Sequence, residues 1–554
     1  MRTTLPSRGR SVIDCAATTR WYMNRRMFHL SLLGAACLIL AQAPAARADE
    51  TEGGSLPVRL SEAALEALQA NPAVGEARLQ WLIRKSQVQG AWGDFEPAFV
   101  TGLSRSHLDR LNTAAESLSM FGQPEYMETR TEYQAAVEGK FFSGAGYRLG
   151  YSISSTESEF ISGHEYESNL GLKVDQPLLK GIARYAPLTS VRLARNEELI
   201  AFHTYRKQMI SVVASVESAY WDLALAQELH RIAADSVRIA NEIAVDARQR
   251  VSVGKMSDLD LSEAEIQLAI RIAEEESSLL AVSEAAAQLR LILGSGRIGS
   301  TVDISAAEPL EWETPEAGPS RDETESRVRE ALRLQPEVLI SRGELEKSGI
   351  QLDYRLDQRL PELNAHASYG FQGLSNSVSG SLQRLQSQDY PSWSLGLELR
   401  LPLLGNLQGE SMLEEARLRK ELAVRKVQAM ERDTAISTGA LLQRMLSYGR
   451  QAENAHTVSG FKKRLLDVEL LRFDTGKSDI RRVYEVEQAL SEARVRELQS
   501  YGRLRRSSVD LASASGTTLR DKGLESMEGE RIILAPVLLA DLRSQPTGQA
   551  PAPR

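Results

Sequence analysis

The chain has 554 residues, of which 42% are hydrophobic and 25% are charged, and its formal net charge is −8. This composition is typical of a folded protein and excludes a chain that is disordered throughout. The acidic balance also excludes nucleic acid as an expected partner, because phosphate binding requires a surplus of Lys and Arg.

The N-terminus predicts export. Arginines at positions 20, 25 and 26 precede an apolar run over residues 30–41, and Ala46-Arg47-Ala48 follows as a cleavage site. We therefore expect residues 1–48 to be a signal peptide, with Met23 or Met27 as alternative starts. Two other interpretations stay open, namely a twin-arginine signal at Arg25-Arg26 and a lipoprotein site at Cys37.

Cleavage would change the chemistry of the mature chain. It removes the two cysteines, Cys15 and Cys37, so that neither a disulfide nor a thiol site is available afterwards. It also removes seven arginines and one aspartate, which changes the net charge from −8 to −14. No run of about 20 apolar residues follows Ala48, so we expect no transmembrane helix and a membrane crossing only as a closed β-barrel.

Short sequence signals recur in the same order in two halves of the chain, which predicts an internal duplication. The matched pairs are Ala67-Leu68 and Ala331-Leu332, Asn71-Pro72 and Gln335-Pro336, residues 170–179 and 395–404, Gly254-Lys255 and Gly476-Lys477, and Gly294 and Gly516. We divide the chain into a first repeat (49–295), a linker or equatorial segment (296–325), a second repeat (326–516) and a C-terminal equatorial segment with a disordered tail (517–554).

Each repeat contains two long segments that predict helices. Residues 188–253 lack Gly and Pro, and an unbroken helix there would be about 100 Å long. Residues 256–293, 410–475 and 477–515 complete the set. Apolar residues recur at seven-residue intervals, which indicates helices that wind around neighbours. They are Leu259, Ile266, Ala273, Leu280 and Ala287 in the first repeat, and Val483, Leu490, Leu504 and Leu511 in the second, where Glu497 occupies the missing step. An ordinary antiparallel coiled coil shares this pattern.

Between the helical parts the period changes to two, which predicts strands. Alternating segments occur near residues 133–141, 147–154, 170–174, 367–371 and 393–401. Their charged face contains Lys173, Glu398 and Arg400, which we expect to line a barrel lumen, although a soluble amphipathic sheet alternates identically. One chain offers four to six strands, too few for a pore, so several copies must share one barrel. Polar stretches 107–130, 157–166 and 373–390 would be the outer loops.

The ordered motifs resemble the TolC-like outer-membrane factor family over about residues 58–517. They are Leu60-Ser61-Glu62-Ala63-Ala64 with Asn71-Pro72, the strand endings 176–179 and 401–404, the turns 250–254 and 472–476, and Leu293-Gly294. The resemblance implies an α+β membrane protein, a homotrimer whose shared transmembrane β-barrel in the outer-membrane lipid continues into a long α-helical periplasmic barrel. It also implies docking on a periplasmic adaptor (membrane fusion) protein and on an inner-membrane efflux pump or ABC exporter.

The same resemblance assigns roles to residues at the two predicted hairpin tips. Arg250, Gly254, Arg472 and Gly476 match the arginine-to-glycine pattern of adaptor docking, although plain turn glycines beside helix-end arginines would look the same. Residues beyond the tips correspond to an aperture gate. They are Asp260 and Glu263 in the first repeat and Arg482 and Glu485 in the second.

Arg482 departs from the acidic pattern of the family, which places a cation-binding ring in doubt. Glu485 would either collect negative charge in a three-fold ring or pair with Arg482 and lock the aperture. A second departure is the stretch 97–177, which holds up to four strands where family members usually have two. The sequence leaves open whether this extra hairpin widens the barrel or lies beside it.

No enzymatic function is expected. The sequence contains no P-loop, GxSxG or HExxH motif, its histidines are scattered, and neither a metal nor a cofactor is indicated. We therefore expect a passive outer-membrane exit channel of a tripartite efflux or type I secretion system. The alternative is a periplasmic coiled-coil adaptor or scaffold without a pore, and a secreted hydrolase is a third class without a candidate nucleophile. The cargo is not indicated.

Overall fold

The computed structural model describes residues 56–119, 122, 124–158, 163–181, 186–294, 304–310, 321–402, 405–475, 477–528 and 531–534. The expected signal peptide, the tail after residue 534 and the tip residue Gly476 lie outside these ranges. Within them the chain is built from long helices and one six-stranded antiparallel sheet, so the expected α+β class is confirmed.

The first repeat follows the predicted order of helix, strands and long helical hairpin. Its elements are β1 (Leu56–Val58), α3 (Leu60–Ala70), α4 (Pro72–Trp92), the short η2 (Gly93–Phe95), β2 (Ala98–Leu111), α5 (Ala114–Ser119), β3 (Glu125–Lys140), β4 (Gly146–Ser158), β5 (His164–Pro177), α6 (Thr189–Ser252) and α7 (Asp258–Leu293).

The second repeat has the same order with two strands fewer. Its elements are α8 (Arg321–Leu334), α9 (Pro336–Gln358), β7 (Glu362–Ser375), α10 (Val378–Ser387), β8 (Pro391–Arg400), α11 (Leu407–Asp474) and α12 (Ile480–Ser515). Helix α8 begins inside the segment 296–325 that we assigned to the linker. Strand β6 (Ile304–Ala306) pairs in parallel with β1, and the short helix α13 (Thr518–Asp521) and the hairpin of β9 (Glu525–Glu528) and β10 (Arg531–Leu534) follow α12.

The duplicated glycines end matching helices for the same physical reason. Gly294 ends α7 with φ +62° and Gly516 ends α12 with φ +70°, a left-handed conformation that favours glycine. A Cβ atom on Gly294 would lie 3.1 Å from the Cα atom of Asn71, and one on Gly516 would lie 2.7 Å from the carbonyl oxygen of Leu334. Each glycine therefore lets the end of its hairpin approach the short helix that begins the same repeat.

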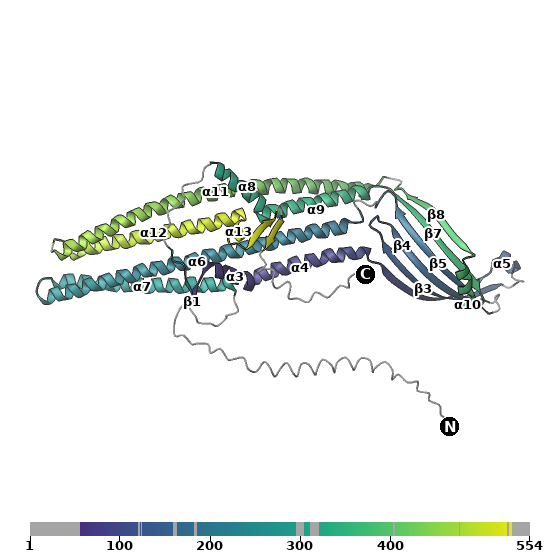
Figure 1. Ribbon diagram of the computed structural model, residues 1–554, viewed down its shortest axis with the longest axis horizontal. Helices are drawn as coiled ribbons and strands as arrows, with labels where there is room; N and C mark the ends of the chain where they lie inside the picture. The colour runs from purple at the N-terminus through teal and green to yellow at the C-terminus, as the bar shows by residue number, and fades with distance from the viewer. Residues whose placement is uncertain are drawn as a thin grey trace, which may run out of the picture. The chain divides into compact units, whose positions relative to one another are not determined.

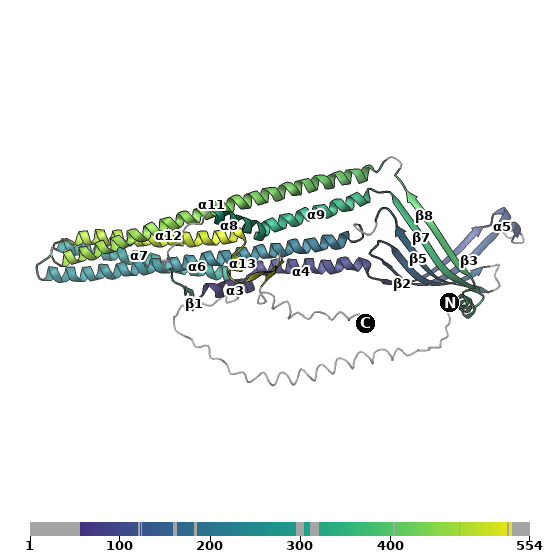
Figure 2. The same cartoon turned by 45° about the horizontal axis from the view of Figure 1, so that its top comes forward.

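The helices lie side by side, and the sheet continues directly from four of them. Helix α6 contacts α4 and α9, and α9 contacts α11, so these four form a row that leads into the strands (Figure 1). Away from the sheet, α6 pairs with α7 and α11 pairs with α12, while α12 also packs along α6. The second view shows the two hairpins extending away from the sheet together (Figure 2).

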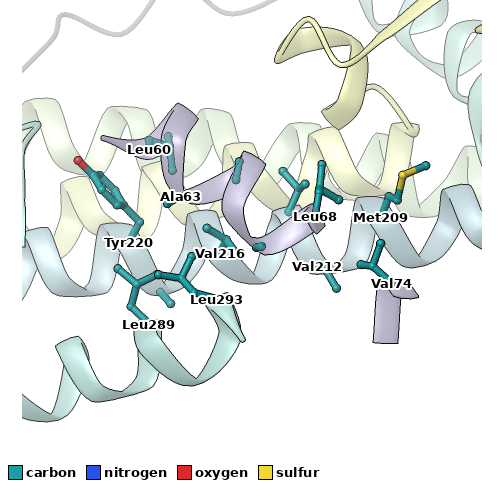
Figure 3. Packing of buried hydrophobic residues seen from close by; sticks show 14 of the residues in the cluster. Leu60, Ala63, Leu68, Val74, Met209, Val212, Val216, Tyr220, Leu289 and Leu293 are labelled. Carbon is teal, nitrogen blue, oxygen red and sulfur yellow. The ribbon is translucent and has the colours of Figure 1, made fainter. Parts of the chain in front are cut away.

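The main hydrophobic core surrounds the middle of α6. Side chains of α3 and the end of α7 pack against it, including Leu68, Val216, Tyr220 and Leu289 (Figure 3). Val216, Tyr220 and Leu289 are fully buried. The apolar face of α3 and the left-handed end of α7 thus bring both ends of the first repeat onto one helix.

A buried ion pair joins this core to the C-terminal segment. The Arg206 guanidinium donates to Glu525 through Nε (2.6 Å) and Nη2 (2.8 Å), and to the carbonyl oxygens of Gly516 (2.9 Å) and Leu334. Both charged side chains are completely buried. The bidentate geometry and the two carbonyls satisfy the guanidinium, which offsets the cost of removing these charges from water.

The two predicted heptad stripes have different surroundings. On α12, Val483 and Leu490 are buried, with 0% and 4% of their surface exposed. On α7, the stripe of Leu259, Ile266, Ala273, Leu280 and Ala287 is exposed throughout, and Leu259 and Leu280 reach 77% and 60%. The expectation that each stripe packs on a neighbouring helix therefore holds within this chain for α12 only.

Three expectations need correction. Strand β2 runs to Leu111 and β3 starts at Glu125, and the two strands stay paired up to these residues. The predicted loop 107–130 is therefore too long at both ends. Strands β4 and β5 likewise enter the stretch 157–166. The stretch 373–390 contains helix α10, whose buried Ser381 lies against Ser168 of β5 (Oγ–Oγ 2.8 Å).

One helix bears on the expectation that the chain has no transmembrane helix. Among the described helices, α6 passes that test, but 61% of its apolar window is buried in the chain. Its apolarity is explained by the core that surrounds it.

Candidate channel wall and hairpin tips

The register of the sheet separates apolar from polar side chains across all six strands. The strand order is β2-β3-β4-β5-β7-β8. One row of directly paired residues crosses the sheet on one face and contains Phe99, Val137, Leu149, Leu172, Tyr369 and Trp393. The adjacent row on the other face contains Glu138, Arg148, Lys173, Ser368 and Ser394. One face therefore suits lipid and the other suits water.

The structure brings the three predicted lumen residues onto this polar face and adds others. The Lys173 ammonium lies 3.5 Å from Asp175, and the Arg400 guanidinium lies 3.6 Å from Glu398. His366 joins these groups, because its Nδ1 is 2.6 Å from Asp175 Oδ1 and its Nε2 is 3.4 Å from Glu398 Oε2. The sequence pattern places His366 on the same face, but only the pairing of β5 with β7 identifies its neighbours.

The outer strands of the sheet have free edges. Strand β2 pairs only with β3 and strand β8 only with β7 among the described strands, and every residue of β8 is exposed. Unpaired backbone N–H and C=O groups cannot remain in lipid, since water is not available to satisfy them. The wall formed by one chain is therefore incomplete.

The two hairpin tips are packed on each other. Gly254, with φ +71°, makes the turn between α6 and α7, and no atom lies within 4 Å of the position of an added Cβ. The Arg250 guanidinium lies over the ring of Phe473 from the other hairpin at 4.6 Å and pairs with Asp246 at 2.7 Å. Arg472 lies 3.3 Å from Glu469 of its own helix. The left-handed backbone at position 254 thus favours glycine. Arg250 connects the two tips through its contact with Phe473.

The four predicted gate residues form two separate local groups. Asp260 completes a capping box at the start of α7, where the Ser257 hydroxyl donates to its carboxylate at 2.7 Å. Arg482 pairs with Glu485 on the same face of α12 at 2.8 Å, with about half of each side chain exposed. Glu263 is partly buried on α7. Among the described residues, no ion pair joins the α7 group to the α12 group.

A buried polar network connects the hairpins instead, and sequence reasoning missed it. Glu487 of α12 accepts from Ser236 of α6 (2.8 Å) and from Arg271 of α7 (2.9 Å), and Arg271 also reaches Glu274 (2.8 Å). Burial, together with the carboxylates of Glu487 and Glu263, raises the pKa of the nearby Tyr484 to about 12. Arg271 and Glu487 are 216 positions apart, so spacing in the sequence gave no signal.

These features define a class of protein. A sheet with one apolar face, one charged face and two open edges, extended by long paired helices, has the features that the protomer of an outer-membrane channel requires. The family described as outer membrane efflux protein matches residues 140–295, and the expected resemblance to TolC-like outer-membrane factors is confirmed.

Solved structures show the same fold. A membrane protein from Pseudomonas aeruginosa matches with a TM-score of 0.58 and 17% identity, over 83% of this chain and 91% of that chain. The CmeC outer membrane channel of Campylobacter jejuni gives 0.55 and 17%, over 85% and 87%. The MtrE outer membrane channel of Neisseria gonorrhoeae gives 0.57 and 14%, over 83% and 89%. The comparison with curated proteins returned no match.

Proposed function

We propose that three copies of the chain form a passive exit duct in the cell outer membrane that continues into the periplasm. The observation that carries the proposal is the six-stranded sheet. Its apolar rows suit lipid, while its edge strands β2 and β8 have no second partner among the described strands. The exposed apolar stripe of α7 supports it, because a neighbouring copy would cover side chains such as Leu280. The chain itself supplies a path, and a separate pump supplies energy.

The partners in this proposal are a periplasmic adaptor and an inner-membrane pump or ABC exporter. Adaptor docking is assigned to the tips, with Arg250, Gly254, Arg472 and Gly476 as the docking residues. The contact of Arg250 with Phe473 supports this assignment, since it makes both tips one surface. A photo-crosslinking amino acid at the exposed tip residue Val253 should capture an adaptor in cells, whereas the same group at Leu407, beside the sheet, should not.

The aperture gate is proposed to involve Asp260, Glu263, Arg482 and Glu485, repeated in each copy. The Arg482–Glu485 pair neutralises charge within one helix, which favours a locked aperture over an acidic ring that collects cations. Exposed pairs of this kind are weak, so an adaptor contact of modest strength suffices to separate them.

The channel function is tested with two neighbouring residues of β8. Leu395→Arg places a charge on the apolar face, which costs about 2–4 kcal/mol near the middle of a bilayer. Ser394→Arg places the same charge on the polar face and serves as the matched control. Outer-membrane fractionation, mass measurement of the detergent-solubilised protein and planar-bilayer conductance should give a conducting trimer for the native chain and the control, and a loss of membrane trimer for Leu395→Arg.

Two results would contradict the proposal. If the native protein is recovered as a soluble monomer of the periplasm, the adaptor or scaffold interpretation replaces the channel. If both arginine variants insert and conduct equally well, the sheet has no lipid-facing side.

A further inference from the structure

Resting on the proposed trimer, we infer that the β3–β4 hairpin is an integral part of the barrel wall, so that each copy contributes six strands and the barrel has eighteen. A protomer with two strands from each repeat would give twelve. Here the first repeat contributes β2, β3, β4 and β5, and the second contributes β7 and β8. The occupant of each free edge is therefore the opposite edge of a second copy of this chain.

Continuous pairing is the first argument. Strand β3 pairs with β2 from Ala98–Glu138 to Leu111–Glu125, and β4 pairs with β5 from Gly146–Asp175 to Glu157–His164. No break separates the inserted hairpin from the strands on either side. If the hairpin lay beside the barrel, β2 would have to pair with β5 in the wall, and both strands would lose their present pairing with β3 and β4.

The division into two faces is the second argument. Val137 of β3 and Leu149 of β4 continue the apolar row between Phe99 and Leu172. Glu138 and Arg148 continue the charged row, and their side chains lie 3.8 Å apart. A hairpin outside the wall would not need the same lipid and water faces as its neighbours.

The periplasmic turn of the hairpin is the third argument, because it is fixed to the start of the helical part. The ring of Phe142 packs against Phe95 of η2 and Trp92 at the end of α4, with centroid distances of 5.1 and 5.9 Å. Gly144 has φ +84°, and a Cβ there would lie 2.7 Å from the carbonyl oxygen of Gly181, which follows β5. The turn thus occupies the space between the chain entering the sheet and the chain leaving it.

The lumen would be wide at the level of these strands. Barrel diameter increases roughly linearly with strand number, so eighteen strands give about one and a half times the diameter of twelve. Small residues face the lumen in one row across the inserted and original strands, namely Ala136, Gly150, Gly171 and Gly370. The barrel is then an open vestibule, and selection of the cargo by size falls to the helical part and its tips.

Thiol labelling tests the inference in the mature chain, which contains no other cysteine once residues 1–48 are removed. A charged maleimide is added to trimers in lipid nanodiscs carrying Ser152→Cys or Leu149→Cys on β4. Asn169→Cys and Leu172→Cys on β5 are the matched references. We expect complete labelling of the two polar-face positions and at least tenfold slower labelling of the two apolar-face positions. Equal labelling of both β4 positions, with Leu172→Cys still protected, would overturn the inference.

Electron cryomicroscopy of the same trimer counts the strands directly, and eighteen are expected. A conducting trimer with twelve wall strands would reject this inference and leave the proposed function intact. Trimer closure is checked separately by disulfide formation between Ser104→Cys on β2 and Ser392→Cys, Ser394→Cys or Gly396→Cys on β8. A ladder up to trimer is expected from one of these pairs, and its absence would contradict the proposed function together with the inference that rests on it.

Discussion

Helices α7 and α12 occupy equivalent places in the two repeats, yet their apolar stripes have opposite surroundings. Helix α12 lies against both α11 and α6, which bury Val483 and Leu490. Among the described helices, α7 packs mainly on α6, and its stripe faces outward. One hairpin is thus completed within the chain, while the other is completed by whatever covers α7.

The comparison teaches that the same heptad pattern in a duplicated module can serve packing within one chain or packing against another molecule. A heptad stripe specifies that a helix needs a partner, but not whether the partner is in the same chain. The charged residues do not follow this division. Arg271 of α7 and Glu487 of α12 pair inside the chain, whereas Arg482 and Glu485 of α12 stay at the surface.

The largest expected effect comes from the buried network that ties the hairpins together. Glu487→Gln leaves Arg271 buried without its α12 carboxylate, which should lower the free energy of unfolding by about 3–5 kcal/mol. Urea denaturation followed by circular dichroism measures it. Glu492→Gln on the same helix removes an exposed partner of Arg496 and should change it by less than about 0.5 kcal/mol. Equal effects would show that the network does not hold α12 in place.

The second effect tests α6, which belongs to the first hairpin and also contacts α12 of the second. Burial, with the Arg206 charge beside it, lowers the pKa of His203 to about 4 from an ordinary value of 6.5. Between pH 6.5 and pH 4, His203 therefore binds a proton in the unfolded chain but not in the folded chain. The free energy of unfolding falls as the pH falls through this window. From pH 7 to pH 5 the loss should be about 2 kcal/mol.

His203→Gln removes this ionisation and should flatten that part of the stability profile. The exposed His456 serves as the control, and His456→Gln should leave the His203 contribution unchanged. A native profile that is flat between pH 7 and pH 5 would contradict a buried neutral His203.

The third effect separates the two stripes. Leu280→Ser on α7 should leave the fold of a single chain unchanged but weaken association by about 1–2 kcal/mol per copy, because the lost contact lies between copies. The temperature at which the trimer dissociates in detergent measures it. Glu276→Ser, exposed on the same helix, is the control. A loss of helix content in Leu280→Ser monomers would place the partner of this stripe inside the chain.

The smallest effect on stability is expected at the proposed gate. Arg482→Ala or Glu485→Ala removes an exposed pair worth a few tenths of a kcal/mol, so unfolding should barely change. Single-channel conductance should rise, since the pair that locks the aperture is lost. Unchanged conductance in both variants would reject the gate.

The sequence was sufficient to predict the elements that repeat a pattern. Runs without Gly or Pro predicted α6 and α7, and long runs without Pro and with few glycines predicted α11 and α12. Period-two alternation predicted five of the six wall strands. Strand β2 was less visible because its second half, with Arg105, His107 and Asp109, places charged side chains on the face where Phe99 and Leu103 precede them.

The remainder had two causes, namely residues that suit more than one role and contacts between distant positions. Asp260 was predicted as a gate residue from its distance to Gly254. In the structure its carboxylate accepts from the Ser257 hydroxyl and caps the start of α7. The same carboxylate in the same place serves either purpose, so the sequence could not separate them. Likewise, the neighbours of His366 depend on the pairing of β5 with β7, which a single sequence does not specify.

The buried Arg206 also sets an order of events as the polypeptide is made. Its carbonyl partners come from Leu334 and Gly516, and its carboxylate partner is Glu525, 319 positions later. Until Glu525 has been synthesised, this guanidinium lacks its carboxylate partner, and enclosing it without one would cost several kcal/mol. The centre of the molecule is therefore complete only when the segment around Glu525 has joined it.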